Sequence, residues 1–503
     1  MTVGELLRAL DRVPGLTRST LPGSDPALDA RCTGVTHDSR RAGRGQIFVA
    51  LVGLKANGAV FAPQAIAAGA SAVVAESPAP ADVSVPWIVV SDARLALAWL
   101  SAEFFEHPSR QMAVVGVTGT NGKTTTSFLV SAILDAAGIQ CGLMGTVTYR
   151  IGDRAFDATR TTPEAPELQG FMRDMVAGGC GACVMEVSSH ALALRRVDGI
   201  RFAAAVFTNL TRDHLDFHGN MEDYFAAKRR LFEMLPADAP ALINVDDPRG
   251  ASLVDVVGRP VTYGISKPAD VSPGPLSYSL RGLDFEIRAP RGVVHVRSRL
   301  VGRPNVYNIL GAVGTALELG VPIAQIEDGL QRLPGVPGRF EVVSAAADDV
   351  TVVVDYAHTD DALRNLLETA RPMATSRLIT VFGAGGDRDR TKRPLMGMVA
   401  ARLSDVVVIT SDNPRNEDPE RIIEEVKRGA DAETRQSNAS IVTAVDRREA
   451  ILEAVRGASP GDVVLIAGKG HEKYQEIGGR KLAFDDIEVA REALEARRVK
   501  SRA

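Results

Sequence analysis

The sequence predicts an α/β protein of three domains. Its 503 residues are enough for about three domains of ordinary size. Short apolar strands alternate with helical stretches along much of the chain, which is the pattern of parallel sheets covered by helices. We expect a smaller N-terminal α/β domain at residues 1–108, a central domain with a parallel sheet at 109–337, and a Rossmann-like, doubly wound C-terminal domain at 338–503.

The composition is that of an ordinary soluble globular protein. Apolar residues make up 45% and charged residues 24% of the chain, and the net charge of −4 argues against a nucleic-acid partner. No run reaches the ~18 apolar residues of a membrane helix, and Glu5 and Asp11 in the first amphipathic stretch argue against a signal peptide. Four cysteines suit a reducing compartment, and we interpret Cys180 and Cys183 as small buried residues. We expect a cytoplasmic monomer without membrane or nucleic-acid partners, ending in a frayed basic tail at 497–502.

The N-terminal segment is expected to bind a ligand without doing chemistry. Its pattern predicts a helix at 61–68 and strands at 46–51, 71–76 and 87–91. A polar loop that contains Ser39 precedes the first strand, and a glycine-rich loop at 53–58 follows it. Each loop can also be an ordinary surface turn. The segment has no nucleophile–base pair, so we predict that it holds part of a substrate.

The central segment begins with a glycine-rich motif, Gly-Thr-Asn-Gly-Lys-Thr at 119–124. An apolar strand at 113–117 precedes it, and a predicted helix at 124–137 follows. Backbone N–H groups converge in such a turn and the helix dipole favours phosphate, so the motif forms an anion cradle. Lys123 would reach the β- and γ-phosphates, and the Thr124 hydroxyl would bind Mg²⁺. We predict an ATP site; the alternative is a glycine turn that caps an ordinary βα unit.

Polar side chains follow two further strands of the central segment. Glu186 lies near the end of a strand at 181–187, and His214 lies in the polar loop after a strand at 203–210. Open α/β sheets bind their ligands at the carboxyl ends of parallel strands. A bare buried carboxylate is costly, so we expect Glu186 to face a metal ion, with a salt bridge as the alternative.

Two later stretches of this segment carry candidate residues on helices. A predicted helix at 221–235 places Lys228 on an otherwise apolar side and Arg229 and Arg230 on the solvated side. Residues 302–308 lead into a helix expected at 309–319. There, Asn305 and Asn308 can be cap residues or adenine contacts.

Four strands are clear in the C-terminal segment, at 350–356, 377–382, 405–410 and 462–467. Each ends in a polar or glycine-rich loop, and these loops lie at 355–358, 383–388, 412–415 and 468–472. Four such loops at one edge of a sheet form a binding face. Arg339, at the seam between the central and C-terminal segments, is placed to serve a nucleotide bound to the central one.

Eight short motifs follow one another along the chain. They are Gly-Thr-Asn-Gly-Lys-Thr at 119–124, Thr-Thr-Pro-Glu at 161–164, Met-Glu-Val-Ser-Ser-His-Ala-Leu at 185–192, Asp-His-Leu-Asp-Phe-His-Gly at 213–219, Asp-Tyr-Ala-His-Thr at 355–359, Gly-Gly-Asp-Arg-Asp at 385–389, Lys-Arg-Pro-Leu-Met at 392–396 and Ala-Gly-Lys-Gly-His-Glu at 467–472. Through these motifs the whole chain resembles the Mur ligases of bacterial peptidoglycan synthesis. The family's own form of the phosphate loop accounts for Val117, where other phosphate loops have Gly. Pro304 and Asp360 depart from the family pattern.

The resemblance implies an ATP-dependent amide ligase that adds meso-diaminopimelate to the D-glutamate of UDP-MurNAc-L-Ala-D-Glu through an acyl phosphate. Lys123, Glu186, His214 and Lys228 would be its catalytic residues. Thr124 and Glu186 would bind one Mg²⁺ and His214 a second, and Lys228 would carry a CO₂-derived carbamate. The positions implied to contact ATP are Gly119, Thr120, Asn121, Gly122, Lys123, Thr124, Thr125, Asn305, Arg339, Asp355 and, after closure, Lys392.

The resemblance also implies two sites for the other substrates. The muramoyl-dipeptide nucleotide would be held by Ser39, Leu54, Lys55, Ala56, Thr161, Thr162, Ser188 and Arg196. The incoming amino acid would be held by Arg388, Asp412, Asn413, Pro414, Arg415, Gly468 and Glu472. We expect Arg415 to pair with the second carboxylate of diaminopimelate and Glu472 with its ammonium.

Two other functions stay open at this point. One is the same ligase reaction with L-lysine or another amino acid. The other is a phosphate-loop ATPase that acts as a nucleotide-gated binding module. For a ligase, an acyl phosphate has to be shielded from water, so we expect the C-terminal domain to close over the central one.

Overall fold

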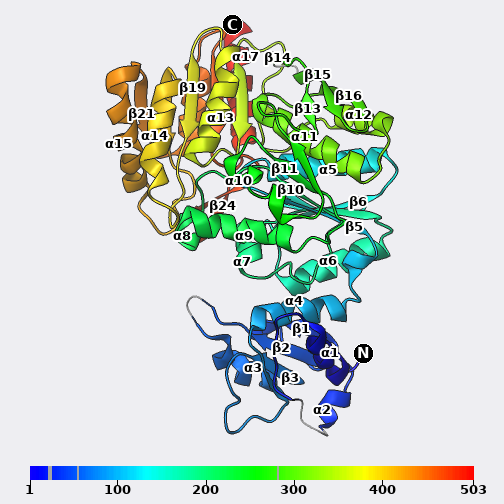
Figure 1. Cartoon of the computed structure of the whole chain (residues 1–503). Helices are drawn as coiled ribbons and strands as arrows, with labels where there is room; N and C mark the ends of the chain where they lie inside the picture. Colours follow the sequence, from blue (N-terminus) through cyan, green and yellow to red (C-terminus); the bar gives the residue numbers. More distant parts are fainter. Residues whose placement is uncertain (21–24, 54–55, 280–281, 503) are drawn as a thin grey trace.

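The computed structural model describes residues 1–20, 25–53, 56–279 and 282–502. The chain folds into three α/β domains, as predicted. Figure 1 shows the N-terminal domain in blue below the central domain, with the yellow-to-red C-terminal domain beside the central one. The N-terminal domain contacts the central domain through helix α4 (Ala93–Phe104), which packs against helix α6 (Ala165–Ala177) of the central domain.

The N-terminal domain is a parallel sheet of four strands in the order β1-β2-β3-β4. The strands are β1 (Gly34–Thr36), β2 (Gln46–Ala50), β3 (Ala72–Ala75) and β4 (Trp87–Val89). The other helices are α1 (Val3–Arg8), η1 (Ala9–Arg12), α2 (Pro26–Asp29), η2 (Ser39–Arg41), η3 (Gly58–Phe61) and α3 (Ala62–Ala67). The polar loop that contains Ser39 thus leaves the end of β1 and forms a short 3₁₀ turn.

The central sheet has eight strands in the order β12-β11-β10-β5-β9-β6-β7-β8. They are β5 (Ala113–Thr118), β6 (Cys141–Met144), β7 (Thr148–Ile151), β8 (Arg154–Asp157), β9 (Ala182–Glu186), β10 (Ala204–Phe207), β11 (Ala241–Asn244) and β12 (Pro260–Tyr263). All pairs are parallel except β6–β7 and β7–β8. The expected parallel sheet is therefore present, with an antiparallel extension at one edge.

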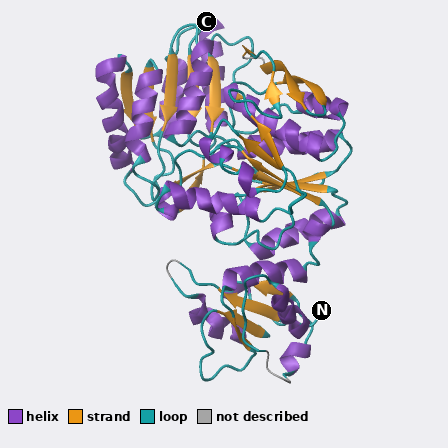
Figure 2. Ribbon diagram, in the orientation of Figure 1, coloured by secondary structure: helices purple, strands orange, loops and turns teal. Residues whose placement is uncertain are grey.

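Helices cover both faces of this sheet (Figure 2). One face packs against α5 (Lys123–Ala136), α11 (Arg303–Glu318) and α12 (Ile323–Arg332), and the other against α6, α7 (Ser189–Ala193) and α9 (Met221–Glu233). The remaining helices are η4 (Pro108–Arg110), α8 (Leu215–His218), α10 (Pro248–Ala251) and η5 (Val254–Val256). A small antiparallel sheet, which the sequence analysis did not predict, contains β13 (Ser272–Pro273), β14 (Ser277–Ser279), β15 (Gly282–Ala289) and β16 (Gly292–Ser298).

The C-terminal domain has a six-stranded sheet in the order β17-β18-β22-β19-β20-β21. Its strands are β17 (Glu341–Val342), β18 (Thr351–Asp355), β19 (Leu378–Phe382), β20 (Val406–Thr410), β21 (Ser440–Ala444) and β22 (Val463–Ala467), and a separate hairpin contains β23 (Tyr474–Ile477) and β24 (Arg480–Ala483). The helices are α13 (Asp360–Ala370), η6 (Arg371–Met373), α14 (Lys392–Leu403), α15 (Pro419–Ser437), α16 (Arg447–Arg456) and α17 (Asp486–Arg502). The four predicted strands, β18, β22, β19 and β20, are consecutive and parallel. Their four loops therefore emerge at one edge.

Three local expectations were wrong. Helix α11 begins at Arg303, because Pro304 lies in the first turn, where a proline is tolerated. Arg230 is not on a solvated face, since it pairs with Asp198 at 2.8 Å. The basic residues at 497–498 are not frayed: they belong to α17 and pair with two aspartates at 348–349.

The four cysteines, Cys180 and Cys183 included, are free and buried as expected. Among the described helices, none combines the length and the apolar sequence that a membrane crossing requires.

Candidate active site

The phosphate loop joins β5 to α5 and depends on two glycines. Gly119 has φ +147° and Gly122 has φ +87°, a region that favours glycine. A Cβ at Gly119 would lie 1.8 Å from Oγ1 of Thr208, and one at Gly122 would lie 2.4 Å from Oδ1 of Asn308. No described side chain caps the N-terminus of α5. Its first amides are therefore available to an anion.

Two lysines converge on one carbonyl of this loop. Nζ of Lys123 donates to the Gly119 oxygen at 3.0 Å, and Nζ of Lys228 donates to the same oxygen at 2.7 Å. Lys228 is 1% exposed. Burial lowers the pKa of Lys228 well below its ordinary value, and the positive charge of Lys123 lowers it further. Lys228 is thus a buried amine whose charged form is destabilised by its surroundings.

Glu186 ends strand β9 beside this loop, and it is 1% exposed. The backbone N–H and the hydroxyl of Thr146 donate to its two carboxylate oxygens at 2.8 and 3.0 Å. Within the described chain it has no salt-bridge partner at 4 Å or less. The described residues therefore do not form the salt bridge that was the alternative, and the carboxylate oxygens keep lone pairs that can bind a cation.

His214 lies in the loop after β10, next to an acidic residue that the sequence analysis left out of the site. Nε2 of His214 is 3.3 Å from Oδ2 of Asp213, and its backbone N–H donates to Oδ1 at 2.9 Å. Burial lowers the pKa of His214 although Asp213 opposes that shift. Burial alone would raise the pKa of Asp213, but His214, His358 and Lys392 lower it. The signal for Asp213 was its place in the Asp-His-Leu-Asp motif.

Four residues expected to hold the muramoyl-dipeptide gather next to Glu186. The Thr162 hydroxyl donates to the Glu186 carbonyl oxygen at 2.8 Å and accepts from the Ser188 N–H at 3.1 Å. Arg196 donates to the Thr162 carbonyl oxygen at 3.1 Å. The Thr161 hydroxyl lies 3.1 Å from the Thr146 hydroxyl.

Ser39 lies apart from these four, in a cavity between the N-terminal and central domains. The cavity has a volume of about 710 Å³. Its lining is His37, Asp38, Ser39, Arg40, Arg41, Phe48, Phe61, Gln64, Thr159, Arg160, Glu164 and Glu167. The Ser39 hydroxyl donates to Oε1 of Gln64 at 2.9 Å. Of the other expected residues in this domain, Ala56 is exposed and does not line the cavity, and Leu54 and Lys55 lie outside the described residues.

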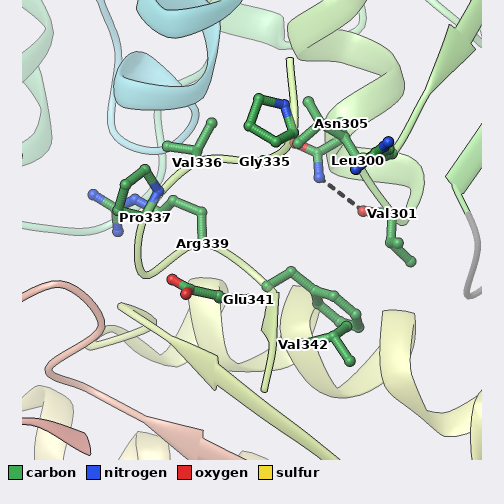
Figure 3. A pocket seen from close by; sticks show the side chains of 12 residues that line it. Leu300, Val301, Asn305, Gly335, Val336, Pro337, Arg339, Glu341 and Val342 are labelled. Atoms are coloured by element: carbon green, nitrogen blue, oxygen red, sulfur yellow. Dashed lines mark hydrogen bonds between the residues drawn. The ribbon is translucent and has the colours of Figure 1, made fainter. Parts of the chain in front are cut away.

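A second cavity, of about 600 Å³, lies at the seam between the central and C-terminal domains (Figure 3). Its lining is Arg299, Leu300, Val301, Asn305, Pro334, Gly335, Val336, Pro337, Arg339, Phe340, Glu341 and Val342. Nδ2 of Asn305 donates to the Val301 carbonyl oxygen at 2.7 Å. The site therefore brings together Asn305 and Arg339, two of the residues expected to contact ATP.

Asn308 and Asp355 support this seam without lining the cavity. Nδ2 of Asn308 donates to Oδ1 of Asn305 at 2.9 Å. Gly302 is the N-cap of α11, so both asparagines lie inside the helix and the cap interpretation was wrong. Oδ2 of Asp355 accepts from the Phe340 N–H at 2.7 Å.

The C-terminal domain contacts the phosphate loop directly. Nη2 of Arg339 donates to the Thr124 hydroxyl at 3.2 Å, and its guanidinium lies 4.4 Å from the ring centre of Tyr356. Nδ2 of Asn121 donates to Oδ2 of Asp361 at 3.0 Å. Burial lowers the pKa of Lys392, at the start of α14, and the Asp213 carboxylate of the central domain opposes that shift. Through these contacts the C-terminal domain packs directly against the phosphate loop.

The expected amino-acid residues lie on the strand-end loops of the C-terminal sheet. Nδ2 of Asn413 donates to Oε2 of Glu472 at 2.8 Å, and Nζ of Lys469 donates to the same oxygen at 3.1 Å. A Cβ at Gly468 would lie 2.5 Å from Oδ2 of Asp412. Glu472 is therefore already paired with a buried lysine, which the sequence analysis missed although Lys469 lies in the same motif.

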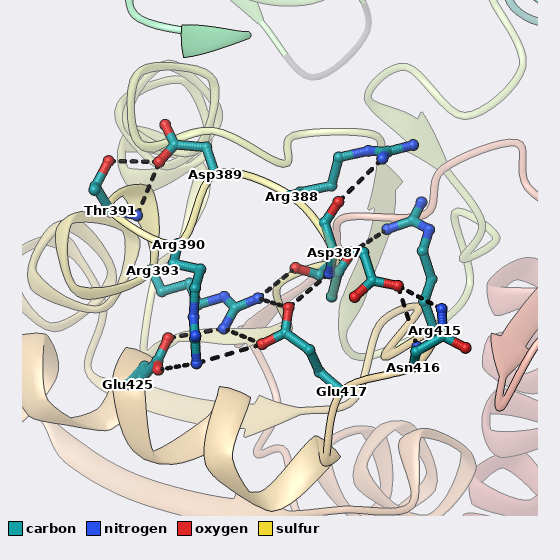
Figure 4. A network of polar contacts seen from close by, with 12 residues as sticks. Asp387, Arg388, Asp389, Arg390, Thr391, Arg393, Arg415, Asn416, Glu417 and Glu425 are labelled. Atoms are coloured by element: carbon teal, nitrogen blue, oxygen red, sulfur yellow. Dashed lines mark hydrogen bonds and ion pairs between the residues drawn. The ribbon is translucent and has the colours of Figure 1, made fainter. Parts of the chain in front are cut away.

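Arg415 and Arg388 lie on the neighbouring loops (Figure 4). Nη1 of Arg415 donates to the Gly386 carbonyl oxygen at 2.7 Å, and Nε lies 3.2 Å from Oε2 of Glu476. Pro414 is buried beside Arg415, whereas Arg388 is exposed. Glu476, on strand β23, was also missed, because it lies beyond every motif in the chain.

Three family models match the chain. Residues 31–105 match the catalytic domain of the Mur ligase family, residues 117–316 the Mur ligase middle domain, and residues 338–470 the Mur ligase glutamate ligase domain.

Individual proteins match over nearly the whole length. The chain is 47% identical to a UDP-N-acetylmuramoyl-L-alanyl-D-glutamate–2,6-diaminopimelate ligase from Gloeobacter violaceus, over 96% of this chain and 97% of that protein. It is 48% identical to the protein of the same name from Geobacter metallireducens, over 92% and 94%. A solved structure of a ligase of this name superimposes with a TM-score of 0.69 at 35% identity and covers 99% of both chains.

Proposed function

The chain belongs to the Mur ligase family, and on that premise we propose that it adds meso-2,6-diaminopimelate to the D-glutamate of UDP-MurNAc-L-Ala-D-Glu. The reaction consumes ATP and releases ADP and phosphate. It would serve cytoplasmic peptidoglycan precursor synthesis, and through it cell shape and division. We divide the chain into domains at 1–108, 109–337 and 338–503, because no sheet formed by the described residues crosses these boundaries.

One observation carries the proposal: the amino-acid loops and the phosphate loop face each other across the domain boundary. Asp389, in the loop at 383–391, pairs with Arg212 of the central domain at 3.0 Å, and Arg339 donates to the hydroxyl of Thr124. A ligase needs its nucleotide, its acid and its amine within reach of one reacting carbon. A nucleotide-gated binding module would not need three amino-acid loops at this position.

The geometry supports a simple reaction path. The amides at the start of α5 and the Lys123 ammonium would hold the γ-phosphate of ATP. The D-glutamate carboxylate, held by residues such as Thr162 and Arg196, would attack this phosphate and release ADP. The amine of diaminopimelate would then attack the acyl phosphate carbon, and collapse of the tetrahedral intermediate would release phosphate. Closure of the C-terminal domain would exclude water from these steps.

The donors near the phosphate loop fit Mg²⁺. No described cluster of three His, Cys, Asp or Glu side chains can hold a metal alone, but Mg²⁺ normally uses one or two carboxylates together with water and substrate phosphates. Thr124, Glu186 and His214 would supply protein donors. Bound there, the ion would neutralise phosphate charge during transfer.

Lys228 suits the proposed carbamate. An amine adds CO₂ only in its neutral form, and burial together with Lys123 favours that form of Lys228. The carbamate would replace a positive charge beside Lys123 with a negative one. It would also supply oxygen ligands for Mg²⁺.

The two cavities suit the two nucleotides. We assign the cavity that contains Ser39 to the uridine diphosphate group and the seam cavity, with Asn305 and Arg339, to the adenosine of ATP. Each has the size of a small-molecule pocket. The assignment places the two nucleotides in separate cavities, one at each domain boundary.

Incubation with ATP and the dipeptide nucleotide tests the function. Amide product and ADP should form with diaminopimelate and not with lysine, as measured by mass spectrometry and phosphate release. Efficient use of lysine would identify the other ligase. ATP hydrolysis that is independent of any amino acid would support the binding module instead.

A further inference from the structure

A buried arginine joins the two loops that precede α14 and α15. Arg393, on the first turn of α14, is 0% exposed. Nη1 donates to Oε2 of Glu417 at 3.0 Å and to Oε2 of Glu425 at 2.7 Å. Nη2 donates to Oε1 of Glu417 at 2.8 Å and to the Gly385 carbonyl oxygen at 3.0 Å. Figure 4 shows this fork at the centre of the network.

Glu417 connects Arg393 to the backbone of the loop at 383–391. Its Oε1 accepts from the Asp387 N–H at 2.6 Å. The Asp387 carboxylate in turn accepts from Nδ2 of Asn416 at 2.8 Å. The loop at 383–391 and the loop at 412–417 are thus held as one unit by a side chain that cannot reach solvent.

Both loops contain a strained residue. Asp387 has φ +51° and Arg415 has φ +53°, a region that residues other than glycine rarely adopt. Such conformations persist only where surrounding contacts over-determine them, and they gather at functional sites. Nη1 of Arg415 donates to the Gly386 carbonyl oxygen at 2.7 Å, next to Asp387. The direction of the Arg415 guanidinium therefore depends on the loop that Arg393 and Glu417 hold.

A lysine could not replace Arg393. The guanidinium is planar and presents two nitrogens to both oxygens of Glu417, whereas an ammonium is a single point charge. A buried ion pair in general adds little net stability to a protein. The fixed geometry that it imposes on its surroundings therefore explains its presence better.

We propose that Arg393 is a positioning residue that sets the amino-acid specificity: through Glu417 it holds the 383–391 and 412–417 loops so that Arg415 is aimed at the second carboxylate of the amino-acid substrate. The inference rests on the proposed function. Arg393 is buried and cannot contact a substrate. Its replacement should therefore weaken the selection of the amino acid and should not abolish phosphoryl transfer.

The test compares Arg393→Lys with the wild type for diaminopimelate and for lysine. The KM for diaminopimelate should rise by about 100-fold, the loss expected when a binding group is misplaced by about 1 Å. The KM values for ATP and the dipeptide nucleotide should change less than about threefold, and the preference for diaminopimelate over lysine should fall by the same factor. Glu417→Gln should shift the same two quantities in the same direction.

Arg402→Lys is the matched control. Arg402 joins the same two helices at the other end of α14, with Nε 2.8 Å and Nη2 3.1 Å from the two oxygens of Glu433. Its substitution should leave the KM for diaminopimelate unchanged. If Arg393→Lys does not fold, as judged by its thermal transition, Glu417→Gln decides.

A folded Arg393→Lys or Glu417→Gln enzyme with unchanged KM and unchanged discrimination would overturn the inference. In that case the wild type would still use diaminopimelate, and the proposed function would stand. A wild type that does not use diaminopimelate would overturn both.

Discussion

Nη2 of Arg212 lies 3.0 Å from Oδ2 of Asp389, and this ion pair joins the central domain to the loop that precedes α14. Arg212 also donates to the hydroxyl of Thr391. Arg212 follows strand β10 in the loop that contains His214, and Asp389 follows Arg388. The pair therefore links the nucleotide side of the site to its amino-acid side.

We expect Arg212→Met to lower kcat by about tenfold, because a contact between the central and C-terminal domains is lost. The KM for ATP should stay the same, since the contacts of ATP with the central domain do not include Arg212. A double-mutant cycle with Asp389→Asn should give a coupling energy of about 0.5–3 kcal/mol. Arg229→Met is the control, since the Arg229–Glu233 pair lies within α9. Strictly additive effects would show that the pair has no role in closure.

Lys228→Ala should be inactive, and acetate should partly restore activity by supplying a carboxylate where the carbamate would be. Carbamate formation should also make wild-type activity depend on dissolved CO₂, measured after degassing and after added bicarbonate. Lys473→Ala, at an exposed lysine, should behave as the wild type. A bare ammonium at Lys228 in an active, metal-loaded crystal would rule out the modification.

Ser39→Ala should raise the KM for the dipeptide nucleotide by about fivefold and leave the KM for ATP unchanged. One lost hydrogen bond is worth about 1 kcal/mol, and Ser39 lies in a cavity separate from Asn305 and Arg339. Steady-state kinetics with each substrate varied in turn measures both constants. An equal rise in the two would count against separate sites.

Arg415→Ala should lower kcat/KM for diaminopimelate by about 1000-fold, because a site built to pair with a carboxylate loses its partner. The low activity with lysine should hardly change, since lysine has no second carboxylate. Arg421→Ala, at an exposed arginine, provides the control. Equal losses for both amino acids would mean that Arg415 supports the loop and does not select the substrate.

Glu417 should contribute to stability in a defined pH range. The hydrogen bonds from Arg393 lower the pKa of Glu417 from 4.5 to about 2. Between these values the unfolded chain binds more protons than the folded one, so the free energy of unfolding falls as the pH falls from 4.5 towards 2. Chemical denaturation should show a shallower decline for Glu417→Gln than for the wild type. Glu424→Gln, at an exposed glutamate of α15, should keep the wild-type slope.

Much of the fold and part of the site follow from local sequence. Apolar runs of four to six residues predicted β5, β9, β18, β19, β20 and β22 within one or two residues, whereas the predicted end of β10 lay three residues too late. The glycines at 119 and 122 predicted the phosphate loop, since only glycine tolerates its φ angles and its close neighbours. The start of α11 was missed because a proline breaks a helix interior but not its first turn.

The tertiary structure decided the partners of charged residues that lie far apart in the sequence. Sequence identified Glu472 as an acceptor, but Asn413 reaches it only because β22 and β20 flank β19 in the sheet. Arg393 meets Glu417 only because α14 and α15 pack side by side.

The physical reason is the range of each interaction. Periodicity and φ preferences act between neighbours in the chain, so the sequence by itself determined the strands, the phosphate loop and the class of chemistry. An ion pair acts through space and depends on strand order and helix packing. The fold therefore decided which carboxylates the buried Arg393 meets.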